Sequence, residues 1–326
     1  MMNFRKLSMV LLAGAAMSVG YAAPASAQAT RTWVSGVGDD ANPCSRTAPC
    51  KTFAGAISKT ATNGEINCLD PGGFGGVTIT KGLTIVCGYT EGGILSAGAG
   101  VNGIIVNAPA TSHVYLGGLD LHGAGSAQNG IRMLAGASLT VEDTVVRAYN
   151  ASNARGFSIQ PSGSSVVALN RVTVSNNGSG ATGGGILIQP TGAAGNARVY
   201  LNAVNLISNA NDAIRVDSTS NTSGAGIVVT ITDSRIVNGT NGVVVVTPVG
   251  ANSAIVNVFN STIYNNPGNA LSVNGANSTI RLAASTVTTN GAATANTGGS
   301  IFSFGDNITV GNSLAPTFTP PTQTRN

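Results

Sequence analysis

Residues 185–188 read Gly-Ile-Leu-Ile, a small residue followed by an apolar-x-apolar triplet, and this pattern recurs along most of the chain. The matches begin at Gly103, Gly130, Gly156, Gly185, Ala213, Gly242, Ala270 and Ser300. Successive matches are separated by 26 to 30 residues. A nearly constant period of this length is typical of a stacked array of structural repeats.

Each repeat also contains two segments in which apolar and polar residues alternate. Residues 169–174 read LNRVTV, and the equivalent residues 201–206 read LNAVNL. Alternation with a period of two predicts short strands with one buried face. A propeller blade is excluded because it has four strands in roughly 40 residues. We therefore predict an all-β fold, a right-handed parallel β-helix of about eight to ten rungs, since left-handed β-helices usually repeat hexapeptides.

Asparagine follows the third segment of several repeats, at Asn177, Asn209, Asn266 and Asn290. Asparagine tolerates left-handed backbone conformations and its amide can hydrogen-bond to a counterpart one repeat away. The spacing therefore predicts an asparagine ladder at one turn of the β-helix.

The composition agrees with a solenoid and excludes other classes. Charged residues are 9% of the 326 residues, and 44 residues are glycine. A coiled coil or helical bundle is therefore excluded, and a hydrophobic fraction of 42% argues against a charge-rich disordered chain. The formal charge of +4 is too diffuse to indicate a nucleic-acid partner.

The first 27 residues have the pattern of a secretory signal peptide. Arg5 and Lys6 precede an uncharged run from residue 7 to residue 23, and Ala25-Ser26-Ala27 follows. We expect cleavage after Ala27 and export to the periplasm, the cell surface or the medium. No later segment is long and apolar enough to predict a membrane span.

Four cysteines agree with an oxidising destination: Cys44, Cys50, Cys68 and Cys87. Three pairings are possible, and the sequence alone does not choose between them. We favour Cys44–Cys50, which closes a short loop, together with Cys68–Cys87, which lie 19 residues apart at equivalent places of two early strands. A zinc site is the alternative, but its usual close C-x-x-C pairs are absent.

The two ends of the stack need covers, because an open rung is an exposed sheet edge. We expect residues 28–63 to form a cap of a strand, a loop and a helix, with Thr52 as the helix N-cap and Phe53, Ala56, Ile57 and Thr60 at helical spacing. Residues 64–312 form the predicted β-helix. Residues 313–326 are a proline-rich tail, expected to be a loose cover.

The same N-terminal segments carry a resemblance to a known family. Residues 32–35 (TWVS), 38–40 (GDD) and 49–53 (PCKTF), followed by 66–72 (INCLDPG), resemble the opening of secreted right-handed parallel β-helix proteins of the pectate-lyase-like superfamily. The resemblance implies the fold over the whole mature chain. It does not fix the activity, because the superfamily includes lyases, hydrolases, esterases and binding modules.

The familiar enzymes of this superfamily have features that the chain lacks. Its lyases abstract a proton with Lys or Arg, often with Ca²⁺ held by clustered carboxylates, yet no lysine follows Lys81 and the aspartates are spread over the stack. Asn211-Asp212 resembles one piece of the polygalacturonase-like hydrolases, but the companion motifs are missing. We expect no cofactor; only the lyase alternative would allow a role for Ca²⁺.

Five residues form the densest titratable group that the repeat register predicts. The inward-facing pattern puts Asp120, His122 and Arg147 on the outside of one sheet, with Asp143 and Arg171 at the neighbouring bend. We call these five residues the titratable patch and consider them as candidate catalytic residues. The alternative is that Asp143 and Arg171 form a surface ion pair and that His122 is merely solvated.

A second set of residues is predicted to point outward from the sheet that holds the Gly-Ile-Leu-Ile repeats. This candidate binding face comprises Arg132, Gln160, Gln189, Arg215 and Asp217. Regularly spaced polar side chains suit a repetitive polymer, and Arg can meet a uronate or sulfate group with two hydrogen bonds. The alternative is a solvated face without a ligand.

Three functions are consistent with these patterns. The first is a secreted, non-catalytic solenoid that binds a polysaccharide or cell-surface polymer. The second is a polysaccharide lyase or glycoside hydrolase that acts on an acidic polysaccharide through the titratable patch. The third is a structural or adhesion element of the cell surface.

Overall fold

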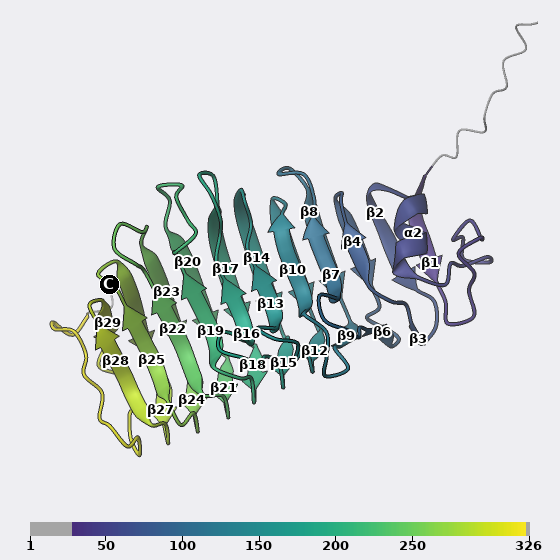
Figure 1. The fold of residues 1–326 in the computed structure, drawn as a ribbon. Coiled ribbons are helices and arrows are strands. Elements are labelled where there is room, and N and C mark those ends of the chain that lie inside the picture. The colour runs from purple at the N-terminus through teal and green to yellow at the C-terminus, as the bar shows by residue number, and fades with distance from the viewer. Residues whose placement is uncertain (1–27, 324–326) are drawn as a thin grey trace, which may run out of the picture.

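The computed structural model describes residues 28–323, so the predicted signal peptide lies outside the described residues. The fold is an elongated right-handed parallel β-helix with one short helix at its N-terminal end (Figure 1). Each coil of the chain contributes one strand to each of three parallel sheets. The predicted fold class is therefore confirmed. Within residues 28–323, no helix has the length and apolar character that crossing a membrane requires.

The three sheets are named A, B and C, and every coil passes through them in the order C, A, B. Sheet A has 11 strands: β1 (Ala29–Val34), β2 (Thr60–Cys68), β5 (Leu83–Val86), β8 (His113–Gly117), β11 (Ser138–Glu142), β14 (Ser164–Asn170), β17 (Asn196–Asn202), β20 (Ile227–Thr232), β23 (Ala254–Phe259), β26 (Ser278–Ala283) and β29 (Ser300–Ser303). Sheet B has nine strands: β3 (Gly72–Gly73), β6 (Gly92–Leu95), β9 (Leu119–His122), β12 (Val145–Arg147), β15 (Thr173–Ser175), β18 (Asn205–Ile207), β21 (Arg235–Val237), β24 (Thr262–Tyr264) and β27 (Thr286–Thr288). Sheet C has nine strands: β4 (Val77–Ile79), β7 (Asn102–Asn107), β10 (Asn129–Ala135), β13 (Arg155–Ile159), β16 (Gly184–Ile188), β19 (Asp212–Asp217), β22 (Asn241–Val246), β25 (Asn269–Asn274) and β28 (Ala292–Thr297).

The register of sheet C follows the sequence repeat. Ile131 lies beside Ile104 on one neighbouring strand and beside Phe157 on the other. The assignment of Ser300–Ser303 to this series is wrong, because that segment is β29 and pairs with β26 in sheet A. The last strand of sheet C is β28 instead. Its sequence, AATANT, has no large apolar residue that would reveal it.

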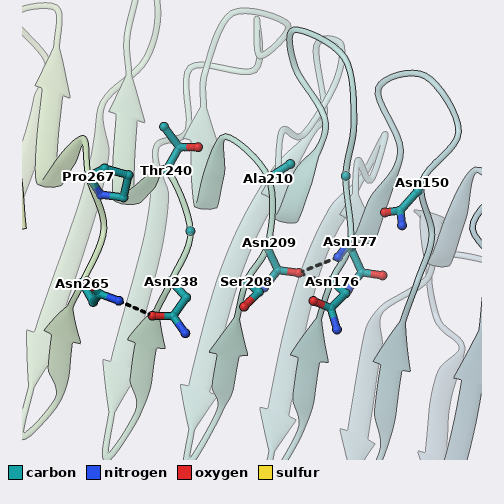
Figure 2. Close-up of a pocket in the computed structure, with 12 residues that line it drawn as sticks. Asn150, Asn176, Asn177, Ser208, Asn209, Ala210, Asn238, Thr240, Asn265 and Pro267 are labelled. Carbon is teal, nitrogen blue, oxygen red and sulfur yellow. Dashed lines mark hydrogen bonds between the residues drawn. The ribbon is translucent and has the colours of Figure 1, made fainter.

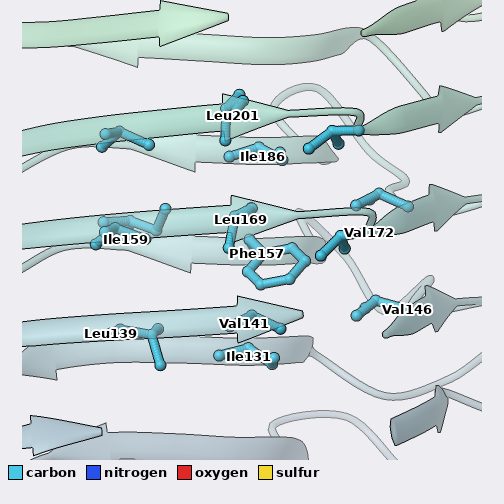
Figure 3. Close-up of a cluster of buried hydrophobic side chains, with 14 of the residues drawn as sticks. Ile131, Leu139, Val141, Val146, Phe157, Ile159, Leu169, Val172, Ile186 and Leu201 are labelled. Atoms are coloured by element: carbon cyan, nitrogen blue, oxygen red, sulfur yellow. The ribbon is translucent and has the colours of Figure 1, made fainter. Parts of the chain in front are cut away.

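Side chains from the three sheets fill the interior of the β-helix (Figure 3). Ile131, Phe157 and Ile186 follow one another along sheet C, while Leu169 and Leu201 come from sheet A. All five side chains are at most 1% exposed. Burial of each such side chain contributes about 1.5–3 kcal/mol, so the apolar columns supply most of the driving force for stacking.

The predicted asparagine ladder is present at the turn between sheets B and C. The Nδ2 atom of Asn177 donates to Oδ1 of Asn209 at 3.1 Å, and that of Asn266 donates to Oδ1 of Asn290 at 2.9 Å. The ladder is interrupted at Gly239, whose backbone N–H donates to Asn266 in place of a side chain. The four asparagines are at most 2% exposed. They therefore hold successive turns in one conformation from inside the molecule.

The N-terminal cap joins the stack directly. Helix α2 (Phe53–Lys59) has Thr52 as its N-cap, as predicted, and its buried Phe53 ring lies 5.2 Å from the ring of Phe74. Strand β1 pairs in parallel with β2, so the cap strand is itself a rung of sheet A. The boundary predicted between residues 63 and 64 falls inside β2.

Both favoured disulfides are formed, Cys44–Cys50 and Cys68–Cys87. The second bond joins the end of β2 to the residue that follows β5 on the neighbouring coil. No free cysteine remains in the described part of the chain, which excludes the zinc alternative there.

The C-terminal tail is bonded to the last coil as far as residue 323, which corrects the prediction of a loose cover. The backbone N–H of Thr319 donates to the carbonyl of Ile301 at 2.7 Å, and Leu314 forms a parallel bridge with Ala292. Phe318 packs against the apolar core. The tail therefore covers the end of the stack.

The asparagine ladder leads to a prediction about stability. In Asn209→Ala, the backbone and side-chain N–H groups of Asn177 lose an acceptor, and the carbonyl of Val174 loses a donor. Because these groups are buried, we expect the free energy of unfolding to fall by about 2–3 kcal/mol. Chemical denaturation measures the change. Asn205→Ala, which removes an outward asparagine side chain from the same coil, is the control, and equal midpoints for the two variants would contradict the structural role of the ladder.

Candidate functional site

A surface groove runs along the turns between sheets B and C (Figure 2). It has a volume of about 700 Å³ and crosses five successive coils. We call it the turn groove, and its lining comprises Asn150, Asn176, Asn177, Gly178, Ser208, Asn209, Ala210, Asn238, Gly239, Thr240, Asn265 and Pro267. All of these side chains are uncharged, so the groove offers amides and hydroxyls.

One column of residues gives the turn groove its regular spacing. Asn176, Ser208, Asn238 and Asn265 occupy equivalent positions and have φ between 54° and 58°, a left-handed conformation that asparagine tolerates well. The amide of Asn265 donates to Oδ1 of Asn238 at 2.7 Å. Since parallel strands lie about 4.8 Å apart, polar groups repeat along the groove at that interval.

At the N-terminal end of the groove, the side-chain oxygen of Asn150 is buried without a hydrogen-bond partner. The side chains of Asn176 and Ser208 take part in no hydrogen bond with the described residues. An unpartnered buried acceptor is costly unless a donor reaches it. The side chains of Asn176 and Ser208, which are exposed and half-buried respectively, can hydrogen-bond to a ligand that lies along the groove.

The candidate binding face on sheet C is less regular than predicted. Gln160 and Gln189 face each other, with Nε2 of Gln160 donating to Oε1 of Gln189 at 2.9 Å. Arg132 and Arg215 lie in one column, but Ser158 and Leu187 occupy the two positions between them. The apolar side chain of Leu187 therefore interrupts the polar side chains of the column, which argues against a uniformly polar face.

Asp217 corrects the prediction for this face, because it is 5% exposed and does not present its carboxylate to solvent. Burial raises the pKa of Asp217, but hydrogen bonds from Thr219 and the charge of Arg215 outweigh burial and hold the pKa below its usual range. Arg215 binds Asp217 at 2.9 Å and Asp212 at 3.2 Å. These three residues therefore form an internal ion-pair group.

A residue that the sequence analysis missed lies beside this group. Arg155 is 4% exposed, and its Nη1 atom is fully buried without a hydrogen-bond partner. Arg155 is the first residue of β13, and the first residues of successive strands of sheet C form a column. In this column, Gly184 follows Arg155 and Asp212 follows Gly184. A Cβ at Gly184 would lie 3.1 Å from Nη1 of Arg155, so the guanidinium occupies the space that the glycine leaves. Burial lowers the pKa of Arg155 to about 10.

The titratable patch separates into two clusters. Arg147 forms a bidentate pair with Asp120, at 3.1 and 2.7 Å, and both residues line a depression of about 500 Å³ together with His122 and Glu91. The hydrogen bond to Asp120 raises the pKa of Arg147. The predicted outward positions of Asp120, His122 and Arg147 on sheet B are confirmed.

The second cluster lies at the bend between sheets A and B. Arg171 forms a bidentate pair with Asp143, at 2.7 and 2.9 Å, and the hydrogen bond from Arg171 lowers the pKa of that carboxyl. Glu142 accepts a hydrogen bond from the hydroxyl of Tyr115 at 3.1 Å. Neither Asp143 nor Arg171 lines the depression at His122. The ion-pair interpretation of Asp143 and Arg171 therefore matches the structure.

The residues present do not fit a Ca²⁺ site. Within residues 28–323, no three side chains of the His, Cys, Asp and Glu types are arranged to hold a metal ion. Asp120 is already neutralised by Arg147. The expectation that no cofactor is needed stays a prediction.

Comparison with known proteins identifies the fold class. No protein-family model and no curated protein matches the chain. Its structure is similar to the crystal structure of pectate lyase Pel9A, with a TM-score of 0.56 and 15% sequence identity over 86% of this chain and 73% of that one. The fold is thus a parallel β-helix similar to that of this pectate lyase, which confirms the resemblance in fold.

The burial of Arg155 leads to a second prediction about stability. The pKa of Arg155 is lower in the folded protein than in the unfolded chain, so the fold disfavours the protonated guanidinium. At neutral pH this charge therefore lowers the free energy of unfolding by roughly 3 kcal/mol, from the conversion of 1.36 kcal/mol per pKa unit. We expect Arg155→Met to raise the free energy of unfolding by about 2 kcal/mol in a buffer of chloride salts.

Denaturation of both proteins at pH 7 measures this difference. Arg198→Met, at an exposed position of sheet A, is the control and is expected to change stability by less than about 0.5 kcal/mol. A loss of stability in Arg155→Met would contradict the cost assigned to the buried charge.

Proposed function

We propose that the protein is exported and binds an extended polysaccharide or other cell-surface polymer without cleaving it. The observation that carries this proposal is the turn groove, which repeats uncharged hydrogen-bonding groups over five coils. The four steps between these five coils together span about 19 Å, at about 4.8 Å for each step. A polymer with hydroxyl groups at regular intervals matches this arrangement.

Three further observations support the proposal. The arginines of the titratable patch are held in bidentate ion pairs, which leaves them poorly suited to act as bases. The fold neighbour Pel9A is a pectate lyase, and its name refers to a polysaccharide. The two disulfides fit an oxidising compartment and so support export.

Removal of side chains from the turn groove tests the binding role. In the double variant Asn176→Gly/Ser208→Gly, the left-handed backbone is retained because glycine adopts it freely. We expect the variant to fold normally and to bind the polymer at least about tenfold more weakly, since two hydrogen bonds of about 1 kcal/mol each are lost. A glycan array identifies the polymer, and calorimetry then measures the dissociation constant.

The matched control is Thr230→Ala, which removes an outward hydroxyl from sheet A, on another side of the coil. It is expected to bind like the unaltered protein. Equal weakening in the control and in the double variant would count against the turn groove. An array that retains no glycan would instead favour a structural or adhesion element of the cell surface.

A second candidate function is supported by the depression around His122. Glu91, Asp120 and Arg147 line the same depression as His122, so acidic and basic groups share a surface that a uronate polymer can reach. Under this alternative, His122 or Glu91 would abstract the proton alpha to the uronate carboxylate. Asp120 and Arg147 would position the sugar.

Incubation with a panel of uronate polymers separates the two functions. Since the leading proposal is non-catalytic binding, we expect no increase in the ultraviolet absorbance of unsaturated sugars, with or without added Ca²⁺. An absorbance increase that disappears in His122→Asn but persists in Arg171→Gln would establish the lyase and overturn the leading proposal.

A further inference from the structure

A smaller depression, separate from the turn groove and from the depression at His122, lies where strands β10 and β13 begin, on the outer side of sheet C. It has a volume of about 280 Å³. Arg132 and Arg155 contribute guanidinium groups to it from neighbouring coils, and Asn153 and Thr182 lie exposed at its rim. No acidic side chain lines it. We call it the arginine pocket.

Both arginines of the pocket have unused hydrogen-bond donors. The Nε atom of Arg132 and the Nη1 atom of Arg155 are buried without partners. Neither guanidinium forms an ion pair with a carboxylate of the described residues. Arg155 is more than nine-tenths buried, and a buried cation without an acceptor is costly. Such an arrangement is typical of a site that receives its counter-ion from outside.

The charges around the pocket do not balance. Asp212 and Asp217 both bind Arg215, and Asp212 also accepts a hydrogen bond from Asn241 at 3.0 Å. Three guanidinium groups, those of Arg132, Arg155 and Arg215, therefore face two carboxylates, and three minus two leaves one positive charge. The unbalanced positive charge belongs to Arg132 and Arg155, which have no carboxylate partner.

We propose that the arginine pocket binds a tetrahedral oxyanion, a sulfate or phosphate group, either as a free ion or as an ester on a polymer. Each guanidinium presents parallel N–H donors that match two oxygen atoms. Two guanidiniums from different coils together present more parallel donor pairs than one carboxylate can meet with bidentate geometry, which favours a tetrahedral group with additional oxygens. The proposal does not depend on the polymer-binding role of the turn groove.

Calorimetric titration of the full mature chain with sodium sulfate, sodium phosphate and sodium acetate at matched ionic strength tests the site. We expect saturable binding of sulfate or phosphate and at least tenfold weaker binding of acetate. Arg155→Met and Arg132→Met are each expected to weaken sulfate binding at least tenfold, whereas Arg198→Met leaves it unchanged. No saturable binding, or equal binding by Arg155→Met, would overturn the proposal.

A second comparison distinguishes the two sources of the anion. If the group is carried by a polymer, a sulfated polysaccharide binds at least tenfold more tightly than inorganic sulfate, and Arg155→Met removes that gain. If the free ion is the ligand, sulfated and unsulfated polymers bind alike while inorganic sulfate or phosphate still binds. Either result supports the site, whereas a gain from sulfation that survives in Arg155→Met overturns it. The Asn176→Gly/Ser208→Gly variant separately reports on the turn groove.

Discussion

Backbone hydrogen bonds between successive coils are the constraint on which the rest of the structure depends. In three parallel sheets, every residue lies over an equivalent residue of the next coil, so strands and turns must repeat together. The buried asparagines meet this requirement at the turn between sheets B and C. Asn209, for example, binds both the backbone N–H and the side-chain amide of Asn177. The buried asparagines thus fix the backbone conformation of each turn. The exposed side chains of the same turns therefore repeat at the distance between successive coils.

The fold could be predicted from the sequence because its signal is periodic. Apolar triplets recur once per coil, and the inward positions that they predict are buried, as Ile131 and Phe157 show. The signal disappears in β28, whose sequence AATANT has no large apolar residue, so Ser300–Ser303 was the next visible match. The helix was also predictable, since Thr52 and the residues after it form a short local pattern. The sequence left three cysteine pairings open, and the favoured pairing is the one that the structure contains.

The candidate sites were only partly predictable, because side-chain pairing depends on positions that periodicity does not report. Asp217 has the outward parity of its strand, yet Thr219 and Arg215 enclose it. Arg155 begins its strand, at a position where the two adjacent coils have Asn129 and Gly184, and nothing in its own sequence marks it as buried. The informative neighbour is Gly184 on the next coil, since only the missing side chain there makes room for the guanidinium.

The geometry of stacking also explains why some charges are neutralised and others are not. Residues on adjacent coils are about 4.8 Å apart, a distance that an arginine and an aspartate close easily. Arg147 with Asp120 and Arg171 with Asp143 are such pairs, and their charges cancel at the surface. Arg155 and Asp212 are separated by the coil of Gly184, and Asp212 is already bound to Arg215. A charge can therefore stay unpaired in this fold when the nearest opposite charge of its column lies two coils away. A ligand with several anionic oxygens can then act as its partner.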